Sequence, residues 1–397
     1  MELLAIFIAL IFAYALLSGR VERSPLTAPM VFTLAGMAAT HLLAPEQRTP
    51  QARDVFLHAA EIGLTLLLFT DASRTNLSLL AHIVGLPARL LTIGMLLTMA
   101  LGALAAAWIF PGLTLWEAGI LAAILAPTDA GLGQVVVTSE RVPAPVREAL
   151  NVEAGLNDGL AVPFLLFFIA MAAGGAQAGG ADLAHFVVEQ LGYATVIGLA
   201  IGGLGGALLG AAVRRGAVTK AWMPLGVLAI PLLCVLASDR FGASMFIAAF
   251  VAGLAVQIRY REAGRHAVEF TEEWGQLVNL SIFFVFGLVA AQAWHDMGAR
   301  HLLYAVLSLT VIRMVPVAIA LLGAKQRPAT VLFMGWFGPR GLASIVLGVV
   351  YLEHASHSEG AATIRLTVIA TVLLSIVAHG LSAKPGIALY ARRMEAA

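Results

Sequence analysis

The 397-residue chain has few charged side chains, since Asp, Glu, Lys and Arg together make up only 12% of it. A water-soluble protein of this length needs a charged surface, so this scarcity argues against a soluble fold. The chain has no basic tract and a formal charge of only +1, which argues against a nucleic-acid partner. Its single cysteine, Cys234, excludes an internal disulfide, and no Cys/His spacing indicates a zinc site. We expect no cofactor.

Apolar residues dominate instead, at 60% of the chain, with a mean hydropathy of +0.90. This balance indicates that lipid is the solvent, and the 39 glycines are typical of closely packed membrane helices. A membrane-spanning helix needs about 20 mainly apolar residues. Thirteen stretches meet this requirement, near residues 2–19, 26–44, 54–71, 87–110, 115–138, 145–173, 183–213, 222–238, 243–257, 268–292, 298–323, 329–352 and 362–390.

The ends of these stretches predict an orientation. If the N-terminus is outside and the C-terminus is cytoplasmic, 17 of the 24 Lys and Arg residues face the cytoplasm and five face outward. This asymmetry is the one that membrane proteins show. The first apolar run lacks a basic segment before it and a cleavage site after it, so we expect a membrane helix and no signal peptide. We also expect no soluble regulatory domain after the last span.

The fifth span has a polar, helix-breaking centre, with Pro127, Thr128 and Asp129 followed by glycines. Proline removes a backbone donor, so we expect this helix to be interrupted inside the membrane. Asp129 then lies where it caps the second half-helix. An ionisable group at this depth is costly and therefore predicts a functional site.

The sixth span places Glu153, Asn157 and Asp158 in the membrane. On a helix, Glu153 and Asn157 are about 40° apart, whereas Glu153 and Asp158 are about 140° apart. One carboxylate can therefore meet a structural partner while the other faces a watery cavity. Arg313 in the eleventh span needs a carboxylate, and Glu153 is the natural candidate. Asp71 and Arg74 are expected at a solvated helix end.

The twelfth span carries Gly-Pro-Arg-Gly at 338–341 and is a second candidate for a broken helix. Spans four to six and eleven to thirteen each place their broken helix second, and the two units enter the membrane from opposite sides. Paired interrupted helices of this kind indicate a transporter site near the midplane. We expect Asp129 to offset the positive half-helix ends and Arg340 the negative ones.

These motifs, together with LLLFTDA (66–72), SMFIAAFVAGL (244–254) and AHGLS (378–382), resemble the NhaP-type branch of the monovalent cation/proton antiporters. The resemblance implies an all-α polytopic fold with two inverted-topology repeats and crossed broken helices. It implies scaffold and dimerisation segments at 1–86 and 175–293. It also implies ion-carrying core segments at 87–174 and 294–397. A homodimer in the cell membrane follows from the same resemblance.

The resemblance also implies the site and the activity. The ion site maps onto Asp158, with Thr128 and Glu153 contributing oxygens and Asp129 nearby. Glu153 and Arg313 correspond to the buried ion pair, with Asn157 beside it. The implied function is electroneutral exchange of one Na⁺ (or Li⁺) for one H⁺, which compete at Asp158. The Ala154 that stands where the family often has Ser leaves K⁺/H⁺ exchange open. A cation channel and a sodium-coupled symporter are the rivals from other classes.

Overall fold

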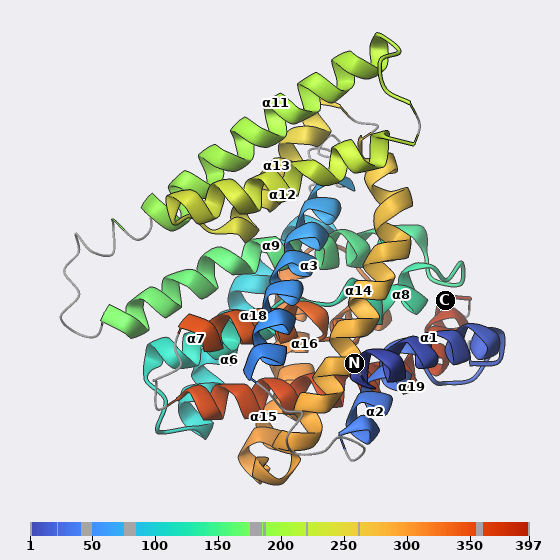
Figure 1. Ribbon diagram of the computed structural model, residues 1–397. Helices are drawn as coiled ribbons and strands as arrows, with labels where there is room; N and C mark the ends of the chain where they lie inside the picture. Colours follow the sequence, from blue (N-terminus) through green and yellow to red (C-terminus); the bar gives the residue numbers. More distant parts are fainter. Residues whose placement is uncertain are drawn as a thin grey trace.

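The computed structural model describes residues 2–21, 23–40, 50–74, 85–174, 185, 188–219, 221–260, 263–354 and 360–395. Throughout these residues the regular structure is helical, as expected, and no strand occurs in them (Figure 1). The helices in chain order are α1 (Glu2–Val21), α2 (Ala28–Ala39), α3 (Pro50–Arg74), α5 (Leu86–Arg89), η2 (Leu90–Gly94), α6 (Met95–Ile109), α7 (Leu115–Leu125), α8 (Ala130–Val137), α9 (Ala144–Gly174), η4 (Val188–Tyr193), α11 (Ala194–Arg214), α12 (Met223–Phe241), α13 (Met245–Arg259), α14 (Ala263–Ala293), η5 (Trp294–Asp296), α15 (Ala299–Leu309), α16 (Val311–Ala320), α17 (Pro328–Trp336), α18 (Leu342–His354) and α19 (Ala361–Glu395).

Among the described residues, nine helical segments are long and apolar enough to cross a membrane, and three shorter apolar helices accompany them. The predicted polytopic all-helical class is therefore confirmed. The count of thirteen spans stays a prediction, although each predicted stretch includes helical residues among those described.

Both predicted broken helices are present. α7 ends at Leu125 and α8 begins at Ala130, while α17 ends at Trp336 and α18 begins at Leu342. The two non-helical connections meet, because the backbone N–H of Asp129 donates to the carbonyl of Pro339 at 2.8 Å. The chain thus brings two segments that are about 210 residues apart into direct contact, as the inverted repeat predicts.

A second pair of irregularities was not visible in the sequence. The helix before the first break contains a π-helical turn, η2. The helix before the second break is divided at Thr310 into α15 and α16, although the sequence predicted one span over 298–323. A π-helical turn often occurs near a functional site. The first helix of each three-helix unit is therefore irregular, near its start in one unit and at its middle in the other.

The remaining helices pack closely around these units. α11, α12 and α13 lie together, and α3 packs against α13; Figure 1 shows the first three far from α15. α2 packs along α14, and two glycines allow the close approach. A side-chain carbon added to Gly287 would collide with the Thr33 carbonyl, and one added to Gly36 with that of Phe284.

Replacing Gly287 with Ala is expected to lower stability by about 1–3 kcal/mol, because the added methyl group forces α2 and α14 apart. Thermal unfolding of the purified protein in detergent measures the loss. The matched control is Gly203→Ala on α11, since an added carbon there meets nothing within 4 Å. That change should leave stability equal or slightly higher. Equal losses in the two variants would contradict the proposed contact.

Candidate functional site

Asp129 caps two helices at once. One carboxylate oxygen accepts the N–H of Leu132 at 2.7 Å, in the first turn of α8. The other accepts the N–H of Leu342, the first residue of α18. Asp129 is only 5% exposed. A single negative charge therefore faces the positive ends of both second half-helices, which agrees with the expectation from the sequence.

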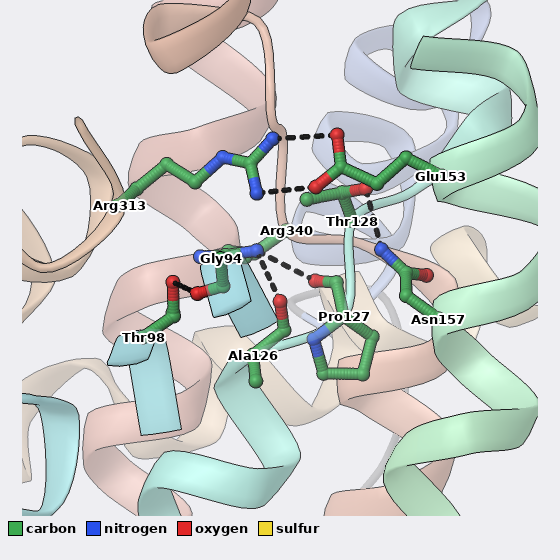
Figure 2. Close-up of polar contacts among 9 residues, drawn as sticks. All are labelled: Gly94, Thr98, Ala126, Pro127, Thr128, Glu153, Asn157, Arg313 and Arg340. Atoms are coloured by element: carbon green, nitrogen blue, oxygen red, sulfur yellow. Dashed lines mark hydrogen bonds and ion pairs between the residues drawn. The ribbon is translucent and has the colours of Figure 1, made fainter. Parts of the chain in front are cut away.

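Arg340 serves the opposite end of α7. Its Nη1 donates to the carbonyls of Ala126 at 2.6 Å and Pro127 at 2.9 Å, as Figure 2 shows. The side chain is fully buried. These carbonyls have no intrahelical partner where α7 ends, so the guanidinium supplies the hydrogen bonds that water cannot supply here.

The end of α17 is satisfied differently from the expectation. The sequence predicted that Arg340 would offset both negative ends, yet the Trp336 carbonyl lies 2.9 Å from His379 Nε2. Since a carbonyl only accepts, Nε2 carries the proton. The hydroxyl of Ser375 accepts the Arg340 N–H at 2.7 Å and lies 3.2 Å from His379 Nδ1, to which it can donate. Nδ1 also lies 3.1 Å from the Ser375 carbonyl, so His379 is held between the end of α17 and the preceding turn of α19.

The ion pair expected between Glu153 and Arg313 is present. Their atoms approach at 2.5 Å and 2.8 Å in a two-bond arrangement, which Figure 2 shows. Each residue is only 2% exposed. When both carboxylate oxygens bond to two guanidinium nitrogens, the hydrogen bonds offset the cost of burying the two charges. Gly338 lies against the guanidinium, where an added side chain would collide.

Asn157 and Thr128 connect the broken helix to α9. Asn157 Nδ2 donates to the Thr128 hydroxyl at 2.7 Å, and both residues are nearly buried. The hydrogen bond fixes the non-helical connection next to Asp129 (Figure 2). Whether Thr128 or Glu153 also coordinates a cation stays a prediction.

Asp158 lies on another face of α9 and is only half-buried. Its Oδ1 is enclosed and has no hydrogen-bond partner among the described residues. Asp71 of α3 packs against α9 at Gly155, one turn before Asp158, and Asp129 caps α8, which also packs on α9. A buried carboxylate oxygen without a hydrogen bond, with two further carboxylates on neighbouring elements, is suited to bind a cation or a proton.

A path of accessible residues leads along α9 to this carboxylate. Glu148, Asn151, Gly155 and Asp158 repeat at helical spacing and are exposed or half-exposed, and Val162 one turn further is buried. A small pocket beside the path is lined by Thr128, Asp129, Ala130, Asn151 and Ala154, with other residues of α8, α9 and the second break. Accessible residues therefore extend along one face of α9 from Asp158 toward the N-terminal end of the helix.

Asp71 is the residue that sequence reasoning misplaced. We expected it at a solvated helix end, but it is half-buried, with its side chain against α9. A carbon added to Gly155 would lie 3.7 Å from the Asp71 Cβ. The signal in the sequence was a carboxylate that directly follows the apolar run LLLFT. Only the packing of α3 against α9 connects it to Asp158.

Crossed broken helices in two opposed units, with charged groups at the crossing, define a membrane transporter of the inverted-repeat class. Residues 6–388 match the protein family described as "Sodium/hydrogen exchanger, transmembrane". The chain therefore belongs to that family and is a multi-pass membrane protein.

Several individual proteins resemble this chain in fold or in sequence. The sodium proton antiporter MjNhaP1 of Methanocaldococcus jannaschii has a similar fold, with a TM-score of 0.73 at 20% identity over 96% of this chain and 99% of that one. The K(+)/H(+) antiporter NhaP of Alkalimonas amylolytica is 26% identical over 72% of this chain and 50% of its own length. The Na(+)/H(+) antiporter 2 of Zygosaccharomyces rouxii is 26% identical over 61% of this chain and 32% of its own length. The chain thus spans half or less of these two curated relatives.

Glu153→Leu and Arg313→Met should each destabilise the protein by about 3–5 kcal/mol, because each leaves a buried charge without its partner. The double variant should lose less than either single variant, since it buries no charge. Unfolding in mixed detergent measures all three. Additive losses would show that the two side chains do not act as a pair.

His379→Ala should cost about 1 kcal/mol, because it removes one of the two donors to the buried Trp336 carbonyl, which also accepts the Gly338 N–H at 2.9 Å. His379→Gln keeps a side-chain N–H and is expected to lose less. Thermal unfolding of both variants checks the difference. Equal losses would mean that packing, and not the hydrogen bond, is what His379 contributes.

Proposed function

We propose that this protein exchanges a monovalent cation for a proton across the membrane, with Na⁺ as the cation and Asp158 as the shared site. The observation that carries this proposal is the state of the Asp158 carboxyl group. It is half-buried, it has an enclosed oxygen without a hydrogen bond among the described residues, and it lies beside two crossed broken helices.

Four charged side chains at the crossing already have partners. Glu153 is held by Arg313, Asp129 by two helix ends, and Arg340 by the end of α7. These groups have fixed partners, so none of them needs to change its charge during a cycle. We infer that Asp158 alternates between a proton and a cation. One positive charge then moves in each direction, which supports electroneutral one-for-one exchange.

Asp71 is the second carboxylate that we place in this site. Its Cβ lies against α9 at Gly155, one turn before Asp158, and we propose that it supplies an oxygen to a cation held there. Oxygen ligands from carboxylates, hydroxyls and carbonyls suit small hard cations. The nearby Thr128 is a further oxygen source from the non-helical connection.

Alternate exposure of the site requires that part of the protein move as one body. The two three-helix units are joined at their centre, because Asp129 bonds to α18 and Arg340 bonds to the end of α7. We propose that residues 87–174 and 294–397 form this moving core. Residues 1–86 and 175–293 then form the scaffold, with the N-terminus outside and the C-terminus in the cytoplasm.

The scaffold is also the proposed dimerisation surface. α1 has no buried residue, and Leu4, Ile8, Phe12 and Leu16 lie exposed along one face of it. An apolar stripe of this kind can face lipid or a second copy of the chain. We propose a homodimer in the cell membrane.

The accessible path favours a transporter over a channel. It ends at Asp158, and the next turn of α9 is buried at Val162. A channel needs a continuous pore with repeated ligand rings. The choice between Na⁺ and K⁺ is open to experiment, since the similar proteins include antiporters named for sodium and one named for potassium. We propose Na⁺ first and K⁺ as the alternative.

Asp158→Asn should abolish cation-driven proton movement, because the amide binds neither a proton nor a cation as a carboxylate does. Proteoliposomes that contain a pH-sensitive dye, given Na⁺, Li⁺, K⁺ or Ca²⁺ in turn, measure this with and without a clamped voltage. The control is Asp239→Asn, an exposed carboxylate of α12, which should leave exchange unchanged. Asp71→Asn should weaken cation affinity more than it changes the maximal rate.

Wild-type flux with Na⁺ that does not depend on voltage supports the complete proposal. Larger flux with K⁺ would assign the alternative cation. Voltage-driven flux would overturn the electroneutral stoichiometry. Exchange that persists in the folded Asp158→Asn variant would reject Asp158 as the shared site.

A further inference from the structure

Two apolar grooves flank α17, the first half of the second broken helix. The groove between α16 and α17 is lined by Met314, Val315, Ala318, Leu322, Val331 and Leu332. The groove between α17 and α19 is lined by Ala329, Leu332, Phe333, Trp336, Gly386 and Leu389. Leu332 belongs to both and is 51% exposed. The grooves therefore run side by side along opposite flanks of one short helix.

Each groove has a cation at the same end. Lys325 precedes α17 and lines the first groove, and Arg393 near the end of α19 lines the second. α17 and α19 run in opposite directions, because Thr330 bonds to Tyr390 at 2.9 Å and Trp336 to Ser382 at 2.9 Å. Arg393 is thus next to the beginning of α17, where Lys325 also lies.

The charges that line the grooves are positive, and the exposed Glu395 at the end of α19 lies outside both linings. No acidic residue lines either groove, and the sequence contains no Asp or Glu between Asp296 and Glu353. Lys325 and Arg393 are exposed, and neither forms an ion pair within the part of the chain that the structure describes. Arg89 adds a third cation nearby, since its Nη1 donates to the Leu322 carbonyl at 2.6 Å.

We propose that this surface binds a two-chain anionic phospholipid that straddles α17. The headgroup phosphate lies over the beginning of the helix, between Lys325 and Arg393, and one acyl chain occupies each groove. Apolar walls at membrane depth bind acyl chains, and cations at the membrane surface attract anionic headgroups. Two grooves on either flank of one helix match a ligand with two chains, and this fit goes beyond the proposed transport function.

The test compares phosphatidylglycerol with phosphatidylcholine of identical chains, added to the purified full chain in detergent. Native mass spectrometry counts the bound lipid. The wild type should retain phosphatidylglycerol in preference. Lys325→Gln and Arg393→Gln should each lower this preference about five-fold. The matched control, Arg214→Gln with Arg215→Gln, removes two exposed cations at the end of α11, away from the grooves.

A second variant distinguishes the contribution of the apolar grooves to lipid binding from that of the cations. Ala318 is exposed on the wall of the first groove, and Ala318→Trp should fill that groove and reduce lipid retention while every cation remains. Thermal unfolding before the binding measurement confirms that each variant is folded. The proposal is overturned if the wild type shows no lipid preference, if the control loses as much as the groove variants, or if Ala318→Trp retains lipid fully.

Discussion

The structure depends on how four helix ends are neutralised inside a membrane. Breaking α7–α8 and α17–α18 at mid-membrane exposes N–H and C=O groups where water is scarce. Asp129 satisfies the N–H groups of both α8 and α18, while Arg340 and His379 each satisfy one carbonyl end. These bonds join the two repeats into one unit.

This arrangement also explains why the ion-carrying role falls to Asp158 in our proposal. A carboxylate that caps a helix or holds an arginine gives up those bonds when it takes a proton or a cation. Glu153 and Asp129 are in that position, and Asp158 is not. The broken helices thus supply a polar, charge-balanced setting, and the neighbouring α9 supplies the group that is free to exchange.

The lipid site that we infer lies on the same structural unit but on its outer surface. α17 connects them, because it ends at Trp336, whose carbonyl bonds to His379, and begins beside Lys325. The helix is therefore in contact with the crossing at one end and with the proposed headgroup at the other. A short half-helix of this kind needs support along its flanks, and acyl chains provide apolar contact there.

The sequence by itself determined the apolar helices, the two breaks, the pairing of Glu153 with Arg313 and the cap by Asp129. A proline breaks the helix at its own position, and a charged side chain in lipid is costly unless it has a partner. Few arrangements of the helices meet both requirements. The tertiary structure alone decided that His379 caps α17, that Asp71 packs against α9 at Gly155, and that the helix before the second break divides at Thr310. These contacts join helices far apart in the chain, and side-chain directions across such distances are set by packing, which no local pattern of residues records.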